Sequence, residues 1–140
     1  MYGLKICIGR ICSFTSYKQH NSFFIPALIK KILRAPNKGK LFIPGLLGTR
    51  DFLSIYDICN AIKILLFNSE IGIYNISSGK PVKLIELAFL IRDKLGRNDL
   101  VIESIQDNKI CLVLDNTKLI NTGFSPKYNI EKILKETGIK

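Results

Sequence analysis

Short apolar runs rich in β-branched residues alternate along this chain with longer segments whose apolar residues recur at helical spacing. The runs that predict strands cover residues 4–11, 41–43, 51–55, 72–76, 100–105 and 110–114. Helical spacing predicts helices over residues 22–35, 57–66, 84–95, 115–123 and 128–136. Strands that alternate with helices indicate an α/β fold, and 140 residues suffice for one domain, 1–140, with one core.

Several polar residues and glycines mark the predicted helix boundaries. Ser22, Asp57 and Asp115 have side chains that can accept a hydrogen bond from the first helical turn, so each predicts a helix start. Gly96 and Gly123 follow the last apolar position of their helices, where a glycine tolerates the left-handed backbone that ends a helix.

The first predicted strand has the composition of a buried strand, yet it opens the sequence. A strand of this kind usually has neighbours on both sides, because parallel sheets are covered on both faces and free edges are protected. The sequence therefore predicts that part of a sheet is missing upstream of residue 4.

The net charge of +10 permits a nucleic acid, an anionic membrane or a phosphorylated ligand as partner. The basic residues are scattered, and no nucleic-acid-binding motif accompanies them, so a solvated basic surface is the favoured interpretation. Apolar runs are too short to span a membrane, and residues 1–14 lack the pattern of a signal peptide. We expect a cytoplasmic protein with no membrane partner.

The four cysteines and the single histidine do not predict a metal site. Cys7, Cys12, Cys59 and Cys111 form no C-x-x-C pair, and each lies among apolar neighbours, which predicts buried, reduced thiols. His20 stands in a polar stretch without a placed carboxylate or nucleophile, so it predicts a surface residue.

The densest motif is GLLGTRDF at 45–52, followed by LSIYDICNAI at 53–62. Further motifs follow in order: IYNISSG at 73–79, a helix-like LIELAFLIRDKL at 84–95, LDNTKL at 114–119 and TGFSP at 122–126. Upstream of them stand YGLK at 2–5, then Arg10, then FIPAL at 24–28. As an ordered series over nearly the whole chain, these motifs resemble the C-terminal, substrate-binding part of the extended short-chain dehydrogenase/reductase family.

The resemblance implies a nucleotide-sugar epimerase, 4,6-dehydratase or 4-keto reductase that uses NAD or NADP. LDNTKL, TGFSP and GLL are similar to the GDP-4-keto-6-deoxymannose reductase branch. The fold it implies is the last strands of a Rossmann sheet with a small α/β substrate domain. The partner it implies is a nucleoside-diphosphate sugar.

Arg50 is the residue to which the resemblance gives the clearest role, binding of the diphosphate. A planar guanidinium that stays charged suits phosphate oxygens, and a preceding glycine loop lets backbone approach a ligand. The alternative is a surface arginine paired with Asp51 or another carboxylate. The remaining candidates, for the nucleobase and the sugar, are Ser22, Pro26, Leu41, Phe42 and Pro44.

These five candidates are predicted from two segments. Leu41 to Pro44 are expected beside the nucleobase, where Phe42 could pack on the base or simply lie in the core. The helix that begins near Ser22 and contains Pro26 would line the pocket and offer its N-terminus to an anion. Tyr74 and Asn75 are expected on the strand beneath the site, or as a structural support of the turn that follows.

The sequence departs from the family in several places, and three of them bear on cofactor binding, catalysis and phosphate binding. It has no Gly-x-x-Gly-x-x-Gly loop for the NAD pyrophosphate, and no Tyr-x-x-x-Lys pair at a plausible site. A second phosphate-binding arginine is also missing, because 104–108 reads SIQDN. We therefore expect that the N-terminal Rossmann half is absent, that the chain alone binds no cofactor, and that it is inactive by itself.

Three functions remain open from the sequence. The first is the nucleotide-sugar-binding portion of an NAD(P)-dependent enzyme, completed by a separate Rossmann half or present in a homo-oligomer. The second is a stand-alone module that binds a nucleotide sugar or a partner protein. The third, supported only by the charge, is nucleic-acid binding. No residue of the chain is assigned a catalytic role.

Overall fold

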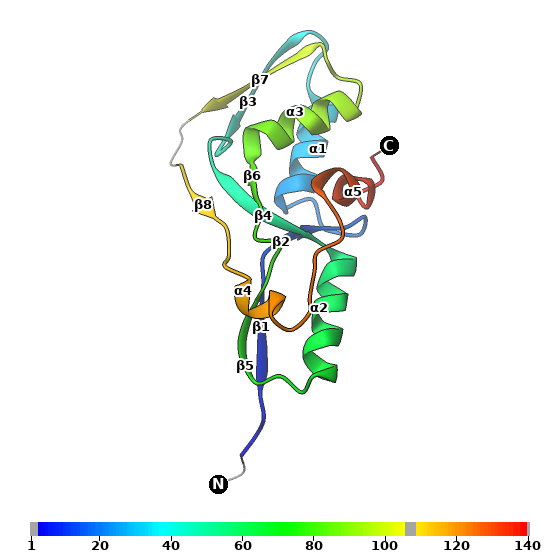
Figure 1. Cartoon of the computed structure of the whole chain (residues 1–140). Helices are drawn as coiled ribbons and strands as arrows, with labels where there is room; N and C mark the ends of the chain where they lie inside the picture. Colours follow the sequence, from blue (N-terminus) through cyan, green and yellow to red (C-terminus); the bar gives the residue numbers. More distant parts are fainter. Residues whose placement is uncertain (1–2, 106–108, 140) are drawn as a thin grey trace.

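The computed structural model describes residues 3–105 and 109–139, and within them strands and helices alternate as predicted (Figure 1). The strands are β1 (Cys7–Ile11), β2 (Ser13–Thr15), β3 (Gly39–Pro44), β4 (Thr49–Ser54), β5 (Gly72–Ile76), β6 (Pro81–Lys83), β7 (Leu100–Ile105) and β8 (Cys111–Leu112). The helices are α1 (Phe24–Arg34), α2 (Ile55–Phe67), α3 (Leu84–Lys94), α4 (Thr117–Ile120) and α5 (Ile130–Lys135). Most of the predicted elements are present. Residues 104–108, where the family's second phosphate-binding arginine is missing from this sequence, lie partly outside the described residues.

The strands form small sheets with β4 at the centre. β4 pairs with β2 in parallel through its second half, and with β6 (antiparallel) and β8 (parallel) through its first half. β1 pairs with β5 in parallel, and β3 with β7 in parallel. Parallel pairs need crossover connections: α1 lies within the connection from β2 to β4, and α1 and α2 lie within the connection from β1 to β5. The mixed α/β prediction is confirmed.

Adjacent residues of β4 reach into two separate hydrophobic cores, because side chains alternate between the faces of a strand. Phe52 is buried in the first core, between α1, α3 and α5, and Leu53 is buried in the second, beneath α2. The chain thus has two cores where the sequence analysis predicted one. β4 is the element that both cores share.

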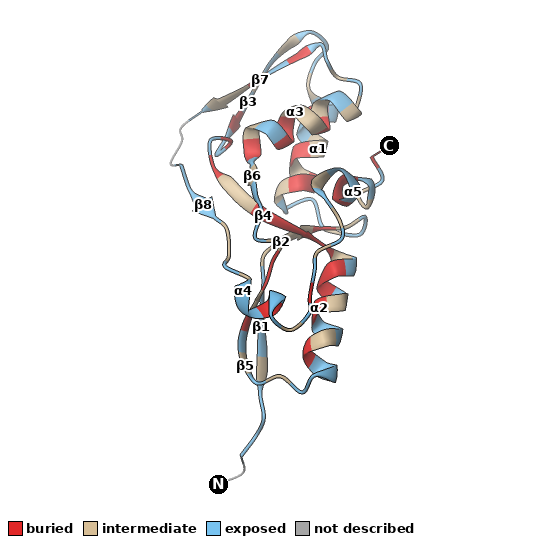
Figure 2. Cartoon of the chain, in the orientation of Figure 1, coloured by how far each residue is buried: buried red, intermediate tan, exposed pale blue. Residues whose placement is uncertain are grey.

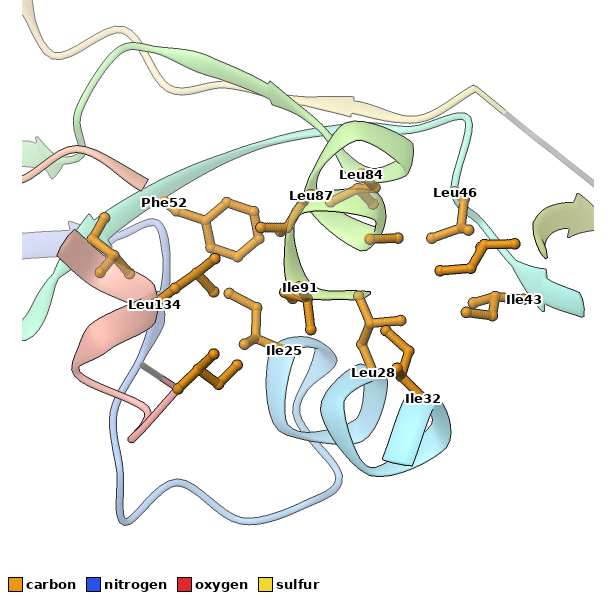
Figure 3. Packing of buried hydrophobic residues seen from close by; sticks show 14 of the residues in the cluster. Ile25, Leu28, Ile32, Ile43, Leu46, Phe52, Leu84, Leu87, Ile91 and Leu134 are labelled. Atoms are coloured by element: carbon orange, nitrogen blue, oxygen red, sulfur yellow. The ribbon is translucent and has the colours of Figure 1, made fainter. Parts of the chain in front are cut away.

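The first core is formed mainly by the inner faces of two helices (Figure 3). α1 contributes Ile25, Leu28 and Ile32, spaced so that they share one helix face, and α3 contributes Leu87 and Ile91. All five side chains are at most 2% exposed. Burying a side chain of this size contributes about 1.5–3 kcal/mol, so these contacts fix α1 against the sheet.

The start of α1 differs from the prediction, and its end agrees with it. The helix begins at Phe24, not Ser22, because the backbone N–H of Ser22 donates to His20 Nδ1 in a turn that precedes the helix. It ends at Arg34, before Pro36, as predicted. The Arg97 guanidinium then donates to the carbonyl oxygens of Ile32 and Ala35 at 2.9 and 3.0 Å and satisfies the last turn.

The prediction that Asp57 caps α2 is wrong. Ser54 is the N-cap, and its Oγ accepts the Tyr56 N–H at 3.1 Å. Asp57 is 2% exposed and accepts the backbone N–H groups of Lys127 and Tyr128 at 3.0–3.1 Å. Its carboxylate therefore fastens the C-terminal segment to α2, a long-range contact that local spacing does not reveal.

The prediction of a buried first strand is also wrong. Four of the five residues of β1 are exposed, and most of the strand is coloured as exposed in Figure 2. α2 covers only one face of the β1–β5 pair, where Tyr74 and Ile76 are buried. The apolar composition of β1 is therefore not explained by burial within the described part of the chain.

Exposure likewise departs from prediction on α2 and at the cysteines. Ile62 and Leu66 were expected on the apolar face of α2 but are 40% and 71% exposed. Cys59 and Cys111 are exposed free thiols, while Cys7 and Cys12 are half-buried free thiols. No helix of the described residues has the length and apolarity needed to cross a membrane.

Replacing Asp57 by Asn should lower the free energy of unfolding by about 1–3 kcal/mol, because one of its acceptor oxygens becomes a donor facing backbone N–H groups. Urea unfolding followed by circular dichroism measures the change. The control is Asp93→Asn, whose carboxylate is 51% exposed and pairs with Arg92, so its loss should cost at most about 1 kcal/mol. An equal loss in both variants would contradict the role assigned to Asp57.

Asp99 should make stability acid-sensitive. Hydrogen bonds from the Arg97 guanidinium and the Lys38 backbone N–H lower the pKa of Asp99 from 3.8 to about 2. Because the pKa of Asp99 is lower in the folded state, its ionised carboxylate stabilises the fold at pH values above the unfolded-state pKa. This contribution to the free energy of unfolding disappears as the pH falls from about 4 to about 2. Urea midpoints of Asp99→Asn should fall less steeply over this range than those of the unmodified chain. If the urea midpoints of the two proteins fell with identical slopes over this pH range, the role assigned to Asp99 would be contradicted.

Candidate functional site

Arg50 lies in a cavity between β4, β2 and the N-terminus of α1. The cavity has a volume of 280 Å³ and is lined by Ile11, Cys12, Ser13, Phe14, Gln19, Phe23, Phe24, Ile25, Arg50 and Phe52. The guanidinium carbon of Arg50 lies 5.2 Å from the centroid of the Phe24 ring, a distance at which a cation is attracted to an aromatic face. The first turn of α1 thus orients the Arg50 side chain.

Arg50 does not pair with Asp51, the alternative that the sequence left open. The two side chains alternate across β4, and the Asp51 carboxylate is 1% exposed. Its Oδ1 accepts from the backbone N–H and the hydroxyl of Ser78, and its Oδ2 accepts from the N–H of Gly79 at 2.9 Å. Among the ion pairs of the described residues none includes Arg50, so its charge faces the cavity uncompensated.

The N-terminus of α1 lines the same cavity. Its N-cap residue, Phe23, makes no side-chain capping hydrogen bond, and the first turn contains no acidic residue. The first N–H groups of a helix have no intrahelical partner and carry a partial positive charge. Together with Arg50, they form an electropositive end to the cavity that suits an anion such as a phosphate.

A second cavity, of 470 Å³, lies along another face of α1. Leu41 and Phe42 of β3 line it opposite Lys30, Lys31 and Arg34 of α1, and its other lining residues are Asn21, Ala27 and Ala35. Phe42 is 50% exposed, so the alternative that it lies in the core is not observed. An exposed ring beside three cations offers a flat surface and positive charge in one place.

Sequence analysis missed these three cations as a group, because it treated the basic residues as scattered. Lys30, Lys31 and Arg34 recur at helical spacing, and that signal places them on one side of α1. None of the ion pairs of the described chain includes them. The expectation of scattered basic residues is therefore wrong for α1, where three of them line one cavity.

The remaining predicted residues are not brought together with Arg50. Pro26 lines a third cavity of 420 Å³, next to Ile29 and Leu33 on α1. Ser22 is exposed and Pro44 ends β3, and neither belongs to the lining of these three cavities. The predicted site is therefore spread over several sides of α1 and not gathered in one pocket.

Tyr74 and Asn75 make contacts that support the fold. The Tyr74 hydroxyl donates to the Glu70 carboxylate, and this hydrogen bond raises the pKa of Tyr74 to about 12. The Asn75 side chain donates to the Asp115 carbonyl oxygen at 2.7 Å. Both contacts tie β5 to neighbouring segments, in agreement with the structural alternative for these residues.

Gly48, in the loop before Arg50, packs against backbone that precedes β8. A Cβ atom on Gly48 would lie 2.9 Å from the carbonyl oxygen of Ile110, so the space next to this glycine is already filled by backbone. The Thr49 N–H donates to the same carbonyl oxygen at 2.9 Å. The close approach at Gly48 therefore serves strand packing.

Residues 1–77 match the sequence pattern that defines the NAD dependent epimerase/dehydratase family. This is more than half of the chain. The chain belongs to the NAD dependent epimerase/dehydratase family. The expectation of an extended short-chain dehydrogenase/reductase is thereby confirmed.

Relatives of this chain include proteins named for GDP-linked sugars. The chain is 35% identical over 118 residues to a GDP-L-fucose synthase of Sinorhizobium fredii, covering 80% of this chain and 38% of that protein. It is 30% identical over 95 residues to the GDP-6-deoxy-D-mannose reductase of Pseudomonas aeruginosa, covering 65% of this chain and 31% of that protein. The chain thus spans well under half the length of these relatives.

Solved structures of the family share this fold. A dTDP-glucose 4,6-dehydratase of Bacillus anthracis in complex with NAD matches with a TM-score of 0.79 and 26% identity, over 97% of this chain and 44% of that one. The structure of RMD from Pseudomonas aeruginosa with NADPH matches with a TM-score of 0.82 and 24% identity, over 96% of this chain and 48% of that one. The fold is that of about half of a Rossmann-type extended family member.

Cys12 is the thiol in the Arg50 cavity, and it should react slowly with alkylating reagents. Burial, followed by the negative charge of Asp51, raises the pKa of Cys12 from 9.0 to about 12, and only the thiolate is a nucleophile. At pH 8 we expect N-ethylmaleimide to modify exposed Cys59 and Cys111 at least roughly a hundredfold faster. Peptide mass spectrometry measures the rates, and Cys12→Ser confirms the assignment. Comparable rates at all three thiols would contradict this.

Proposed function

We propose that this chain is the nucleotide-sugar-binding portion of an NAD(P)-dependent epimerase, dehydratase or reductase, and that Arg50 binds the diphosphate. The observation that carries the proposal is an arginine without an acidic partner among the described residues, facing a cavity together with the uncapped N-terminus of α1. Relatives named for GDP-linked substrates make a GDP-sugar the first ligand to examine.

Each part of the site has a physical role in this proposal. The Arg50 fork and the first N–H groups of α1 would each donate to phosphate oxygens. Phe42 would pack on the nucleobase, and Leu41 would extend that apolar surface. Lys30, Lys31 and Arg34 would add positive charge beside Phe42 in the second cavity. Ser22, Pro26 and Pro44 remain predictions for the rim of the pocket.

The cofactor of the proposed enzyme would be held elsewhere. NAD(P) supplies the hydride transfer of the family, and the protein positions the substrate against it. The sequence has no Gly-x-x-Gly-x-x-Gly loop for the NAD pyrophosphate, and we assign none of its residues as acid or base. The proposal therefore gives this chain the task of binding and orienting a sugar nucleotide, without activity of its own.

The location of the chain in the cytoplasm is part of the same proposal. All four cysteines are free, and two are exposed, a state that a reducing compartment maintains.

Replacing Arg50 by Ala should weaken GDP binding by at least about tenfold, because charge-assisted hydrogen bonds contribute roughly 1.5–3 kcal/mol. Arg50→Lys should recover part of the loss, since an ammonium keeps the charge but not the planar fork. Isothermal titration calorimetry with GDP, and with guanosine as a ligand without phosphates, measures the effect. The Arg50 variants should bind guanosine as the unmodified chain does.

A matched control is Lys63→Ala, which removes a cation that lies 5.7 Å from the Phe67 ring on α2, away from the cavity. It should leave GDP affinity unchanged. Equal losses in the two variants would mean that the net charge alone attracts GDP. Tight binding of an RNA oligonucleotide with a steep salt dependence, and none of GDP, would favour the nucleic-acid alternative.

A further inference from the structure

The second cavity, between β3 and α1, is the part of the candidate site whose selectivity the proposed function leaves open. Leu41 and Phe42 are consecutive residues of β3, so their side chains leave the strand on opposite faces, yet both line this cavity. The cavity therefore lies at the edge of β3, with the exposed Phe42 ring on one side and α1 on the other. A planar base that stacks on this ring would turn one of its edges toward α1.

The polar side chains that α1 presents to this cavity are hydrogen-bond donors. They belong to Lys30, Lys31 and Arg34, and lysine and arginine side chains have N–H donors but no acceptor. Among the described residues, no carboxylate lines the cavity and no ion pair includes these three cations. Asn21, in the loop before α1, adds an amide to the lining. A ligand edge that faces α1 must therefore offer acceptors.

Two acceptors near the cavity are already engaged by other cations. The carbonyl oxygen of Ala35, after the last turn of α1, accepts from the Arg97 guanidinium at 3.0 Å. The Glu103 carboxylate, on the residue opposite Phe42 in the β3–β7 register, pairs with Lys40 at 2.7 Å and does not line the cavity. Neither group offsets the excess of donors on the α1 side of the cavity.

The nucleobases differ in the acceptors that they offer to such donors. Guanine has two adjacent acceptors, O6 and N7, on one edge, and this pair is a frequent partner of arginine. Adenine has an amine donor at N6 beside its N7, so the same edge would bring a donor against the cations. Uracil has a single acceptor, O4, at the corresponding position. Guanine is therefore the base that this side of the cavity fits best.

We propose that Arg34 is a specificity-determining residue of this site, which selects guanine by donating to its O6 and N7 while the base stacks on Phe42. The inference rests on the proposed function, in which Arg50 binds the diphosphate of the same ligand. Arg34 brings the one guanidinium to this lining, and its rigid planar fork matches two adjacent acceptors in one plane. Lys30 and Lys31 act as point charges that attract the anionic ligand without reading its base.

The first test compares nucleoside diphosphates on the whole chain by isothermal titration calorimetry. GDP and inosine diphosphate share O6 and N7 and should bind equally. ADP and UDP should each bind at least about tenfold more weakly, because each lacks one of the two adjacent acceptors. Equal affinities for GDP, ADP and UDP would overturn the proposal, as would tighter binding of ADP through Asn21. Inosine diphosphate lacks the guanine amine, so its weaker binding would mean that the opposite edge of the base is read.

The second test pairs one ligand atom with one residue. 7-Deaza-GDP, in which a carbon replaces N7, should bind the unmodified chain at least about fivefold more weakly than GDP. Arg34→Met should bind these two ligands alike, a loss of discrimination that a merely destabilised variant would not show. The control is Lys63→Met on α2, at the other end of the molecule in Figure 1, which should keep the full preference for GDP. Persistence of that preference in Arg34→Met would overturn the proposal.

Arg50→Ala separates this inference from the proposed function, because the two arginines line different cavities. GDP binding that depends on Arg34 and N7 but not on Arg50 would refute the diphosphate site and leave the base selection intact. GDP binding that depends on Arg50, with no preference among the bases, would refute the base selection alone. A chain that binds none of these nucleotides would refute both.

Discussion

The arrangement of the strands in this chain depends on the hydrogen bonds that the Asp51 carboxylate accepts. It lies in β4 and accepts three hydrogen bonds from Ser78 and Gly79, which follow β5 directly. β4 shares its side chains between the two cores, so Asp51 ties the β1–β5 pair to the strand that bears Arg50. A buried carboxylate is tolerated only when such donors surround it. Removing this carboxylate would therefore destabilise the packing of both cores and disturb the orientation of the Arg50 cavity.

α1 connects this framework to the candidate site, because it presents a different set of residues on each of its sides. One side is fixed in the first core, the N-terminus opens on Arg50, and a third side meets β3 across three cations. A single amphipathic helix thus fixes the position of the ring, the cations and the uncapped end relative to the sheet. The proposed binding of a nucleotide sugar depends on packing at Ile25, Leu28 and Ile32 that no ligand would contact.

The sequence predicted the positions of helices and strands better than the segments that pack against them. Helical spacing located α1 and α3, and the motif series led to the correct family. Local patterns failed where distant segments decide the outcome: Asp57 binds residues 70 positions further along, and the side chain of Asp51 reaches the turn after β5. β2 and β6 were missed because three residues are too few to show alternation. The separation of the predicted site residues over several sides of α1 likewise depends on tertiary packing.

The failed prediction for β1 is the most informative of these departures. Apolar, β-branched residues were selected in a strand whose described surroundings expose them, although the same composition in β5 is half covered by α2. Burial of a strand depends on which segments pack against its faces, and composition carries no information about that packing. An apolar, β-branched composition therefore predicted the strand β1 but not its exposure. A Cβ atom on Gly9 would lie 2.6 Å from Cδ1 of Ile76, so this glycine leaves room for the Ile76 side chain in the second core, which packing against a distant segment decides.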